Sequence, residues 1–374
     1  MSGKTIRYAI VGAGNIARVH TMACKELGDV ELVAIVDTDA DRAESFARNW
    51  GYEKWTTNLE QLVELGLDVV GICTPHPTHA ALIERIAALK LNIMVEKPLD
   101  VNLARSRAAL KAADLHGVKI GVIFQRRYWP AAQRIKALTT GAAFGDIVQG
   151  ECIVHFSRTQ EYFSPARSAW RGRWETEGGG VLVNQASHAI DMFQWLMGPI
   201  EGVYAQWTNL THPGVEVDTS VAATLRFANG ALGVVSLALN PRQSDQSYSQ
   251  ISIYGSSGQW ASVREEPEGS WGLNVNWDVP GESEAMAERT AKERAEDKRM
   301  YRIFENGLKP PIQYGECHRL QYADFFSYLR DGTPYDLTGW EGIKTVEIIE
   351  AIYESARRNS LVSFPLQDRE VISA

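Results

Sequence analysis

The chain has 374 residues, a length that suits two domains, and its 45% hydrophobic and 22% charged residues exclude a largely disordered protein. Its 46 acidic and 38 basic side chains give a formal net charge of −8, which argues against a nucleic-acid partner. The four cysteines form no CxxC pair, no stretch of about 18 apolar residues occurs and the start lacks a signal-peptide pattern, so we expect a cytoplasmic protein without a membrane partner.

In residues 6–124, short β-branched runs alternate with stretches whose apolar residues recur at helical spacing. This alternation is typical of a parallel sheet covered by helices on both faces, and it predicts an α/β domain over residues 1–125. The predicted strands are Tyr8–Val11, Leu32–Val36, Val69–Cys73, Ile93–Val95 and Lys119–Phe124.

After Gln125 the pattern changes to longer alternating segments, which predict an α+β domain with an antiparallel sheet over residues 126–374. Asn229-Gly230 predicts a type I′ hairpin turn, in which both residues have positive φ. The predicted strands are 148–157, 203–211, 221–227, 231–239 and 250–254, and the predicted helices are 131–139, 185–196, the highly charged 280–306 and 342–358.

The second domain has too few predicted helices to cover both faces of its sheet. An uncovered apolar face is an interaction surface, so we expect the chain to form a homodimer or homotetramer, sheet to sheet.

A dinucleotide-binding pattern follows the first predicted strand. Gly12 allows a sharp turn, Gly14 lets the backbone approach a pyrophosphate, and the small Ala17 permits close packing of the next helix. Asp37 ends the second strand, where its carboxylate would accept from a ribose 2′-hydroxyl and repel a 2′-phosphate. Because residues 38–41 add acid and no adjacent arginine, NAD is expected in preference to NADP.

Two segments follow later strands of the same sheet: Thr74–His79, and Glu96-Lys97-Pro98. Ligands of open α/β sheets bind beyond the carboxyl ends of the strands, so both segments are predicted to border the cofactor. Each has an ordinary alternative. Glu96-Lys97 could be a solvated charged turn, and His79 could be a residue in the first turn of a helix.

A third group of residues lies in the second domain, from Trp170-Arg171 through the glycine triplet at 178–180. Asn184, His188 and Asp191 follow, spaced so that they share one helical face. The alternative is a capped, exposed helix. His188 and Asp191 without a third ligand do not predict a metal site.

The motifs GAGNIA, EKP and GGGVLVNQASHAID, in this order and spacing, resemble the Gfo/Idh/MocA family of sugar and polyol dehydrogenases, and the likeness covers nearly the whole chain. The resemblance implies an N-terminal Rossmann domain and a C-terminal domain whose open-faced, mostly antiparallel sheet serves oligomerisation. It matches Lys97 and His188 to the family's catalytic lysine and histidine. Asn184 stands where many inositol and glucose dehydrogenases carry Asp, which leaves the acid–base work to Lys97 and His188.

The resemblance implies oxidation of a secondary ring hydroxyl, such as that at C3, in a pyranose sugar, anhydrosugar, glycoside or cyclic polyol. His188 could take the hydroxyl proton and Lys97 stabilise the alkoxide, or Lys97 could be the base. Two alternatives are a UDP-N-acetylhexosaminuronate-type nucleotide-sugar 3-dehydrogenase and a non-catalytic NAD or sugar sensor. The predicted cofactor-binding residues are Gly12, Gly14, Asn15, Ile16, Asp37, Thr74, Pro75, His76, His79, Glu96, Lys97, Trp170 and Arg171, and the predicted substrate-binding residues are Lys97, Arg126, Tyr128, Asn184, His188 and Trp174.

Overall fold

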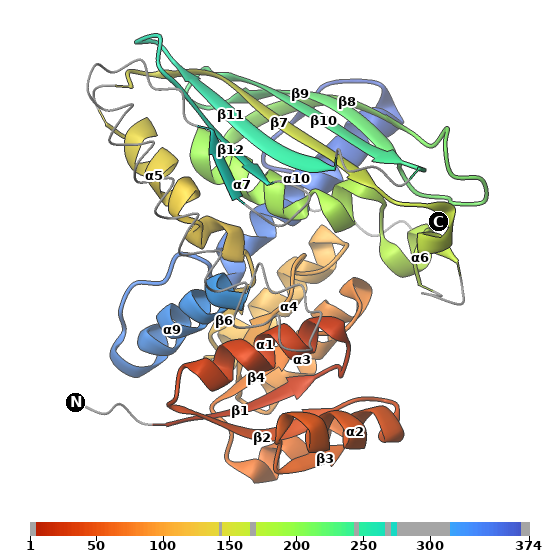
Figure 1. The fold of residues 1–374 in the computed structure, drawn as a ribbon, viewed down its shortest axis with the longest axis vertical. Coiled ribbons are helices and arrows are strands. Elements are labelled where there is room, and N and C mark those ends of the chain that lie inside the picture. The colour runs from red at the N-terminus through yellow and green to blue at the C-terminus, as the bar shows by residue number, and fades with distance from the viewer. Residues whose placement is uncertain are drawn as a thin grey trace. The chain divides into compact units, whose positions relative to one another are not determined.

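The computed structural model describes residues 5–141, 144–164, 170–242, 247–265, 271–274 and 315–367 (Figure 1). The chain divides into two compact units, Met1–Gln125 with Gly307–Val346, and Arg126–Asn306 with Glu347–Ala374. The charged helix predicted over 280–306 lies outside the described residues. None of the described helices is long and apolar enough to cross a membrane.

The first unit contains a six-stranded parallel sheet in the order β3-β2-β1-β4-β5-β6, which confirms the predicted Rossmann-type architecture. The order reverses between β1 and β4, and this switch point is where such sheets bind ligands. The five predicted strands are present; the short β3, whose residues are largely exposed, lacks the apolar run that would predict it. The strands are β1 Ile6–Val11, β2 Val30–Val36, β3 Lys54–Thr56, β4 Val69–Ile72, β5 Asn92–Val95 and β6 Ile120–Val122.

Helices connect these strands and begin where short polar side chains can cap them. The Asp39 side chain accepts from the Arg42 N–H at the start of α2, and the Asn102 side chain accepts from the Arg105 N–H at the start of α4. The α-helices are α1 Asn15–Glu26, α2 Ala40–Trp50, α3 His79–Ala88 and α4 Leu103–Leu115; the 3₁₀ turns are η1 Leu59–Leu65, η2 His76–Thr78 and η3 Gln125–Tyr128, the last of which begins at the boundary with the second unit.

The first unit is completed by a segment from the end of the chain. Helix α9, Gly315–Asp331, packs against α1, and the Leu337 carbonyl accepts from the Val122 N–H at the free edge of β6. The predicted second domain includes every residue after 125, whereas the structure groups the described residues 315–346 with the first unit. An amphipathic pattern predicts that a helix buries one face, but not which sheet it covers.

The second unit contains an eight-stranded sheet in the order β13-β12-β11-β7-β10-β9-β8-β14. All neighbours are antiparallel except β7 and β10, which confirms the mostly antiparallel prediction. The turn between β9 and β10 is present, but only Gly230 has a positive φ, +85°, so the type I′ prediction is wrong. The strands are β7 Ile147–Ser157, β8 Ile200–Thr208, β9 Ser220–Phe227, β10 Leu232–Asn240, β11 Tyr248–Gly255, β12 Trp260–Glu265, β13 Trp271–Asn274 and β14 Val362–Ser363.

Among the described residues, helices cover one face of this sheet and the other face is open. Helix α7 packs against β7 and β11, and α5 packs against β12 (Figure 1). In β9 and β10 buried and exposed residues alternate, as expected when one face meets solvent. The remaining elements are α5 Pro130–Thr139, η4 Gln160–Phe163, α6 Trp174–Glu177, the π-helix η5 Val181–Gln185, α7 Ser187–Met197 and α10 Gly339–Arg358, whose end belongs to this unit.

Candidate active site

The turn between β1 and α1 has the geometry of a dinucleotide cradle. Gly12 has φ +98°, and a Cβ there would lie 2.8 Å from the carbonyl carbon and oxygen of Cys73, so no larger residue fits. Among the residues that the structure describes, nothing lies within 4 Å of a Cβ built on Gly14 and no side chain caps α1. The first N–H groups of α1, from Asn15 and Ile16 onward, therefore border open space and fit a pyrophosphate.

Asp37, directly after β2, is held in place beside this turn. Its Oδ2 accepts from the Ala13 N–H at 2.8 Å, and its Oδ1 accepts from Arg42 Nη2 at 2.8 Å. Partial burial acts to raise the pKa of Asp37, but the bonds from Arg42, Asp39 and Ala13 outweigh it and lower the pKa, so the carboxylate is ionised. No arginine lies directly beside Asp37 in the sequence, but the first turn of α2 brings Arg42 back to Asp37 from five residues away.

The segments after β4 and β5 are joined by a buried histidine. The ring nitrogens of His79 lie 2.8 Å from the Pro98 carbonyl oxygen and 2.9 Å from that of Thr74. Thr74 and Thr78 share a hydrogen bond of 2.7 Å between their hydroxyls. His79 is fully buried, so it fixes the two loops to each other, which is a structural role beyond the first-turn position considered from sequence. His76 is 9% exposed and packs its ring against His79.

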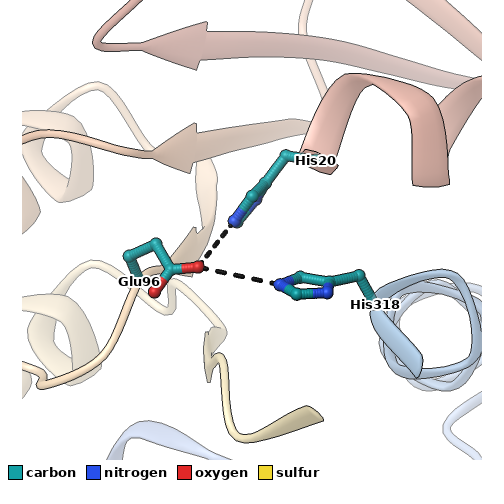
Figure 2. A group of neighbouring side chains, drawn as sticks. All are labelled: His20, Glu96 and His318. Carbon is teal, nitrogen blue, oxygen red and sulfur yellow. Dashed lines mark hydrogen bonds and ion pairs between the residues drawn. The ribbon is translucent and has the colours of Figure 1, made fainter. Parts of the chain in front are cut away.

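The Glu96 side chain is buried in the interior of the first unit (Figure 2). The alternative of a solvated charged turn is therefore wrong for this residue. Its Oε1 lies 2.9 Å from Nε2 of His20 on α1 and 3.8 Å from Nε2 of His318 on α9. Its Oε2 accepts from the main-chain N–H of Lys97 at 3.0 Å. Burial opposes ionisation, but the hydrogen bond from His20 and the proximity of His318 hold the pKa of Glu96 well below its usual range.

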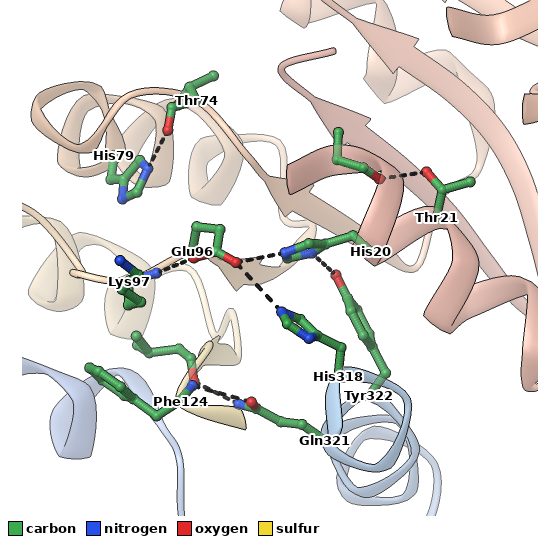
Figure 3. A network of polar contacts seen from close by, with 12 residues as sticks. His20, Thr21, Thr74, His79, Glu96, Lys97, Phe124, His318, Gln321 and Tyr322 are labelled. Atoms are coloured by element: carbon green, nitrogen blue, oxygen red, sulfur yellow. Dashed lines mark hydrogen bonds and ion pairs between the residues drawn. The ribbon is translucent and has the colours of Figure 1, made fainter. Parts of the chain in front are cut away.

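The direction of each hydrogen bond in this network follows from its members (Figure 3). Burial lowers the pKa of His20, so at neutral pH its ring carries one N–H, which donates to Glu96. The other nitrogen, Nδ1, then accepts from the Tyr322 hydroxyl at 2.7 Å, and that hydroxyl accepts from Tyr8 at 2.7 Å. The result is one buried negative charge, on the residue directly before Lys97.

His20, Glu96 and His318 are also a possible metal-ligand set, the one group of three found among the described residues. The donors and acceptors of His20 and Glu96 are accounted for by hydrogen bonds within the unit. We therefore assign the group to hydrogen bonding. His20 and His318 are absent from the predicted site, because a lone histidine in a helix carries no signal of its partner.

In the second unit, the glycine triplet at 178–180 lets other parts of the chain pack closely against its backbone, as the sequence predicts. A Cβ on Gly179 would lie 2.2 Å from the Tyr353 hydroxyl, and one on Gly180 would lie 1.8 Å from the Asp218 carbonyl oxygen. Asp218 is fully buried and accepts from the N–H groups of Gly180 and Leu182 and from the Tyr353 hydroxyl. These bonds anchor the start of η5.

Asn184 and His188 lie on consecutive elements and not on one regular helix, because η5 is a π-turn that ends before α7 begins. His188 is the second residue of α7 and is 9% exposed. Asn184 Nδ2 donates to Glu177 Oε1 at 2.7 Å and to the Tyr162 hydroxyl at 3.3 Å. The face of α7 that carries His188 and Asp191 is buried, in contrast to the exposed alternative.

The predicted residues around 170–174 form an aromatic group. The Arg171 guanidinium lies 4.1 Å from the Tyr162 ring centroid and 5.0 Å from that of Trp170. Trp174 packs edge-on against Trp207 and Tyr353, and is 36% exposed.

The two arginines after the first unit form buried ion pairs. Arg126 pairs with Glu265 at 2.7 Å, and Arg127 binds Asp191 through two hydrogen bonds of 2.8 and 2.6 Å. Both arginines are at most 5% exposed, and Tyr128 beside them is partly exposed. The charges of these arginines are therefore balanced inside the unit.

A parallel sheet with a glycine turn after β1 and an acid after β2 defines a Rossmann-type dinucleotide-binding domain. Comparison with known proteins agrees. The family model "Oxidoreductase family, NAD-binding Rossmann fold" matches residues 6–124, and "GFO/IDH/MocA C-terminal domain" matches residues 132–261. The chain belongs to the Gfo/Idh/MocA family, as its motifs predict.

Three relatives illustrate the likeness. An inositol 2-dehydrogenase of Rhizobium meliloti is 31% identical over 270 residues, 70% of this chain and 77% of the relative. A levoglucosan dehydrogenase of Pseudarthrobacter phenanthrenivorans is 25% identical over 97% of this chain and 99% of the relative. The WlbA dehydrogenase of Bordetella pertussis, solved with NADH and UDP-GlcNAcA, has a TM-score of 0.83 and 27% identity, covering 98% of this chain and 100% of that one.

The protein is thus an NAD-dependent oxidoreductase acting on CH–OH groups of sugars or polyols. This confirms the predicted reaction class and cofactor. The roles of individual residues stay predictions.

Proposed function

We propose that the enzyme oxidises a secondary ring hydroxyl, such as that at C3, of a pyranose sugar, anhydrosugar, glycoside or cyclic polyol. The observation that carries this proposal is the anchoring of Lys97, whose main-chain N–H donates to the buried, ionised Glu96 at the carboxyl end of β5. Such an anchor holds a lysine beside the edge of the sheet where the dinucleotide turn lies.

NAD+ supplies the hydride acceptor when bound. The chain must then hold the hydroxyl, remove its proton and stabilise the oxygen as the carbonyl forms. We assign the proton to His188, because an imidazole can accept a proton, and we assign the positive charge that stabilises the forming alkoxide to the Lys97 side chain. Asn184 orients the substrate, since an amide cannot exchange a proton at neutral pH.

A nucleotide-sugar substrate is the second candidate, favoured by the likeness to WlbA, which was solved with UDP-GlcNAcA. A diphosphate would need positive charge from the second unit. The ion pairs of Arg126 with Glu265 and of Arg127 with Asp191 engage two arginines that could supply it, which favours the smaller substrates. Lys97 and His188 argue against a sensor that lacks turnover.

NAD+ reduction should be screened with inositols, glucose, levoglucosan, simple glycosides and UDP-sugars, and the oxidised carbon of each product located by NMR. We expect turnover of a free sugar, anhydrosugar, glycoside or polyol. Turnover of UDP-sugars alone would establish the second candidate, and no turnover of any carbohydrate would contradict the proposal.

The proposed roles are tested by Lys97→Ala and His188→Ala, each of which should lose about two to four decades of kcat with NAD+ affinity retained in calorimetry. Asn184→Ala should lose less. Near-wild-type turnover of His188→Ala would show that α7 does not carry the active site.

We also propose a homodimer or homotetramer assembled through the open face of the second sheet, in the cytoplasm. The solvent-facing residues of β9 and β10 support the first proposal, and the four buried free cysteines fit the second.

A further inference from the structure

Glu177 links the two parts of the second unit that carry predicted site residues. The residue ends α6 and is 1% exposed. Its Oε2 accepts from the Gly172 N–H at 2.6 Å, directly after Trp170-Arg171, and its Oε1 accepts from Asn184 Nδ2 at 2.7 Å. The two carboxyl oxygens of Glu177 thus bind two different segments, one at Gly172 and the other at Asn184.

The surroundings of Glu177 both oppose and favour ionisation of its carboxyl group. Burial raises its pKa to about 7, although the bonds from Gly172 and Asn184 and the positive charge of Arg171 act to lower it. Asp218 adds a like charge, and its own carboxyl accepts from the Tyr353 hydroxyl of α10.

Two further titratable groups lie near the other end of this arrangement. Tyr162 of η4 contacts Asn184 through its hydroxyl, and His188 follows Asn184 on α7. Both are retained in every variant proposed below, so their titration is common to all of them.

We propose that Glu177 is a positioning residue whose proton selects which end of the Asn184 carboxamide faces the substrate. The inference rests on the proposed function, in which Asn184 orients the substrate hydroxyl. Glu177 itself is placed behind Asn184 and acts through it.

The two states follow from the donors and acceptors. An ionised Glu177 only accepts, so Asn184 must turn its NH₂ group toward it, as in the structure. On protonation the hydrogen goes to Oε1, because Oε2 already accepts from the Gly172 N–H. Oε1 then donates, and the amide must rotate to present its oxygen to Glu177. The end of the amide that points away from Glu177 changes from oxygen to nitrogen.

Glu177→Gln mimics the protonated state. Its amide oxygen must accept from the Gly172 N–H, which leaves its NH₂ group toward Asn184. Glu175→Gln is the matched control, since Glu175 is an exposed acid on the same helix. Asn184→Asp places two carboxyls face to face, which should raise the pH at which the pair ionises.

The first measurement needs no substrate. Infrared difference spectra between pH values well below and well above neutrality should show the band of a protonated carboxyl that disappears with a midpoint near 7. We expect this band in wild type and Glu175→Gln, a shift of its midpoint to higher pH in Asn184→Asp, and its absence in Glu177→Gln. Persistence of the band in Glu177→Gln would overturn the proposal.

The second measurement is the KM of the best substrate from the screen across the same pH range. A hydrogen bond with mismatched donor and acceptor changes affinity by about tenfold, so the wild-type KM should change by about that factor. Glu177→Gln should keep, above neutrality, the KM that wild type has below it, with kcat changed little. Identical pH dependence of KM in wild type and Glu177→Gln would also overturn the proposal. If no substrate is found, the proposed function is contradicted. The infrared measurement still tests the protonation of Glu177, because it needs no substrate.

Discussion

At the scale of single residues, cofactor choice depends on two opposite charges beside the dinucleotide turn. Asp37 is ionised and would accept from a ribose 2′-hydroxyl, and Arg42 lies against it with half of its side chain exposed. A carboxylate repels a 2′-phosphate and a guanidinium binds one. The carboxylate prevails because it lies directly at the end of β2, and it neutralises the arginine.

Asp37→Ala should therefore both weaken the use of NAD+ and improve the use of NADP+. With the carboxylate gone, Arg42 is released toward the ribose, and the ratio of kcat/KM for NADP+ to that for NAD+ should rise by about ten- to hundredfold. Steady-state kinetics with both cofactors measures this ratio. In Asp37→Ala/Arg42→Ala most of the NADP+ gain should vanish; a gain that survives would show that Arg42 has no part in it.

A second prediction at this scale concerns stability. The pKa of Glu177 is raised in the folded protein to about 7, from an ordinary value of 4.5. The folded state then binds its proton more tightly than the unfolded state, so the stabilising contribution is complete below pH 4.5 and is lost as pH rises through about 7. Glu177→Gln should remove this loss, which is about 3 kcal/mol. Denaturant unfolding at acidic and alkaline pH should show the variant gaining on wild type as pH rises, and a constant difference would contradict the shift.

At the scale of elements, helix α9 supplies hydrogen-bonding side chains to the interior of the first unit, most of which is formed by the N-terminal part of the chain. Tyr322 joins Tyr8 on β1 to His20 on α1. Gln321 donates to the Val122 carbonyl and accepts from the Phe124 N–H, at the edge strand β6. A helix near the end of the chain thus completes hydrogen bonds that begin in the first residues.

Tyr322→Phe should leave the His20 ring nitrogen and the Tyr8 hydroxyl buried without this partner. Unmet buried polar groups cost about 1–3 kcal/mol, so the free energy of unfolding should fall by that amount. Tyr328→Phe on the same helix, where the ring is partly exposed, should change it by less than about 0.5 kcal/mol. Equal effects of the two substitutions in denaturant unfolding would argue against the network.

At the scale of the whole molecule, the open face of the second sheet is the surface through which we expect copies to associate. Tyr204, Thr224 and Val234 lie side by side on adjacent strands of this face, and Tyr204 and Val234 are each 41% exposed. An exposed sheet face with apolar side chains is a typical interaction surface, because burying these side chains against a second copy removes them from water.

Light scattering at micromolar concentration should accordingly report a dimer or tetramer of the 41.6 kDa chain. Val234→Asp introduces a charge at the centre of the open face and should shift the protein toward monomer. Leu115→Asp, on an 87% exposed position of α4, should not. A wild-type monomer, or equal effects of both substitutions, would refute the sheet-to-sheet arrangement.

Much of this protein is determined locally and can be predicted from its sequence. The glycine turn, the acid after the second strand and the period of each strand depend on neighbouring residues, because turns and faces follow from φ, side-chain size and alternation. The sheet classes, the NAD cofactor and the family follow from these patterns. The positions of Lys97 and His188 follow from motifs with fixed spacing.

Only the tertiary structure decided which distant residues share a buried charge. The sequence leaves a solvated turn open for Glu96, but α1 and α9 bring His20 and His318 to it. No sequence pattern singles out Glu177, whose partners Gly172 and Asn184 are known only from the structure. Arg42 reaches Asp37 because α2 turns back, and Gly315–Asp331 returns to the first unit because its apolar face covers α1. Local patterns specify that a side chain is charged or that a helix has an apolar face, but the partner is chosen by packing across the chain, where burial makes each unpaired group costly.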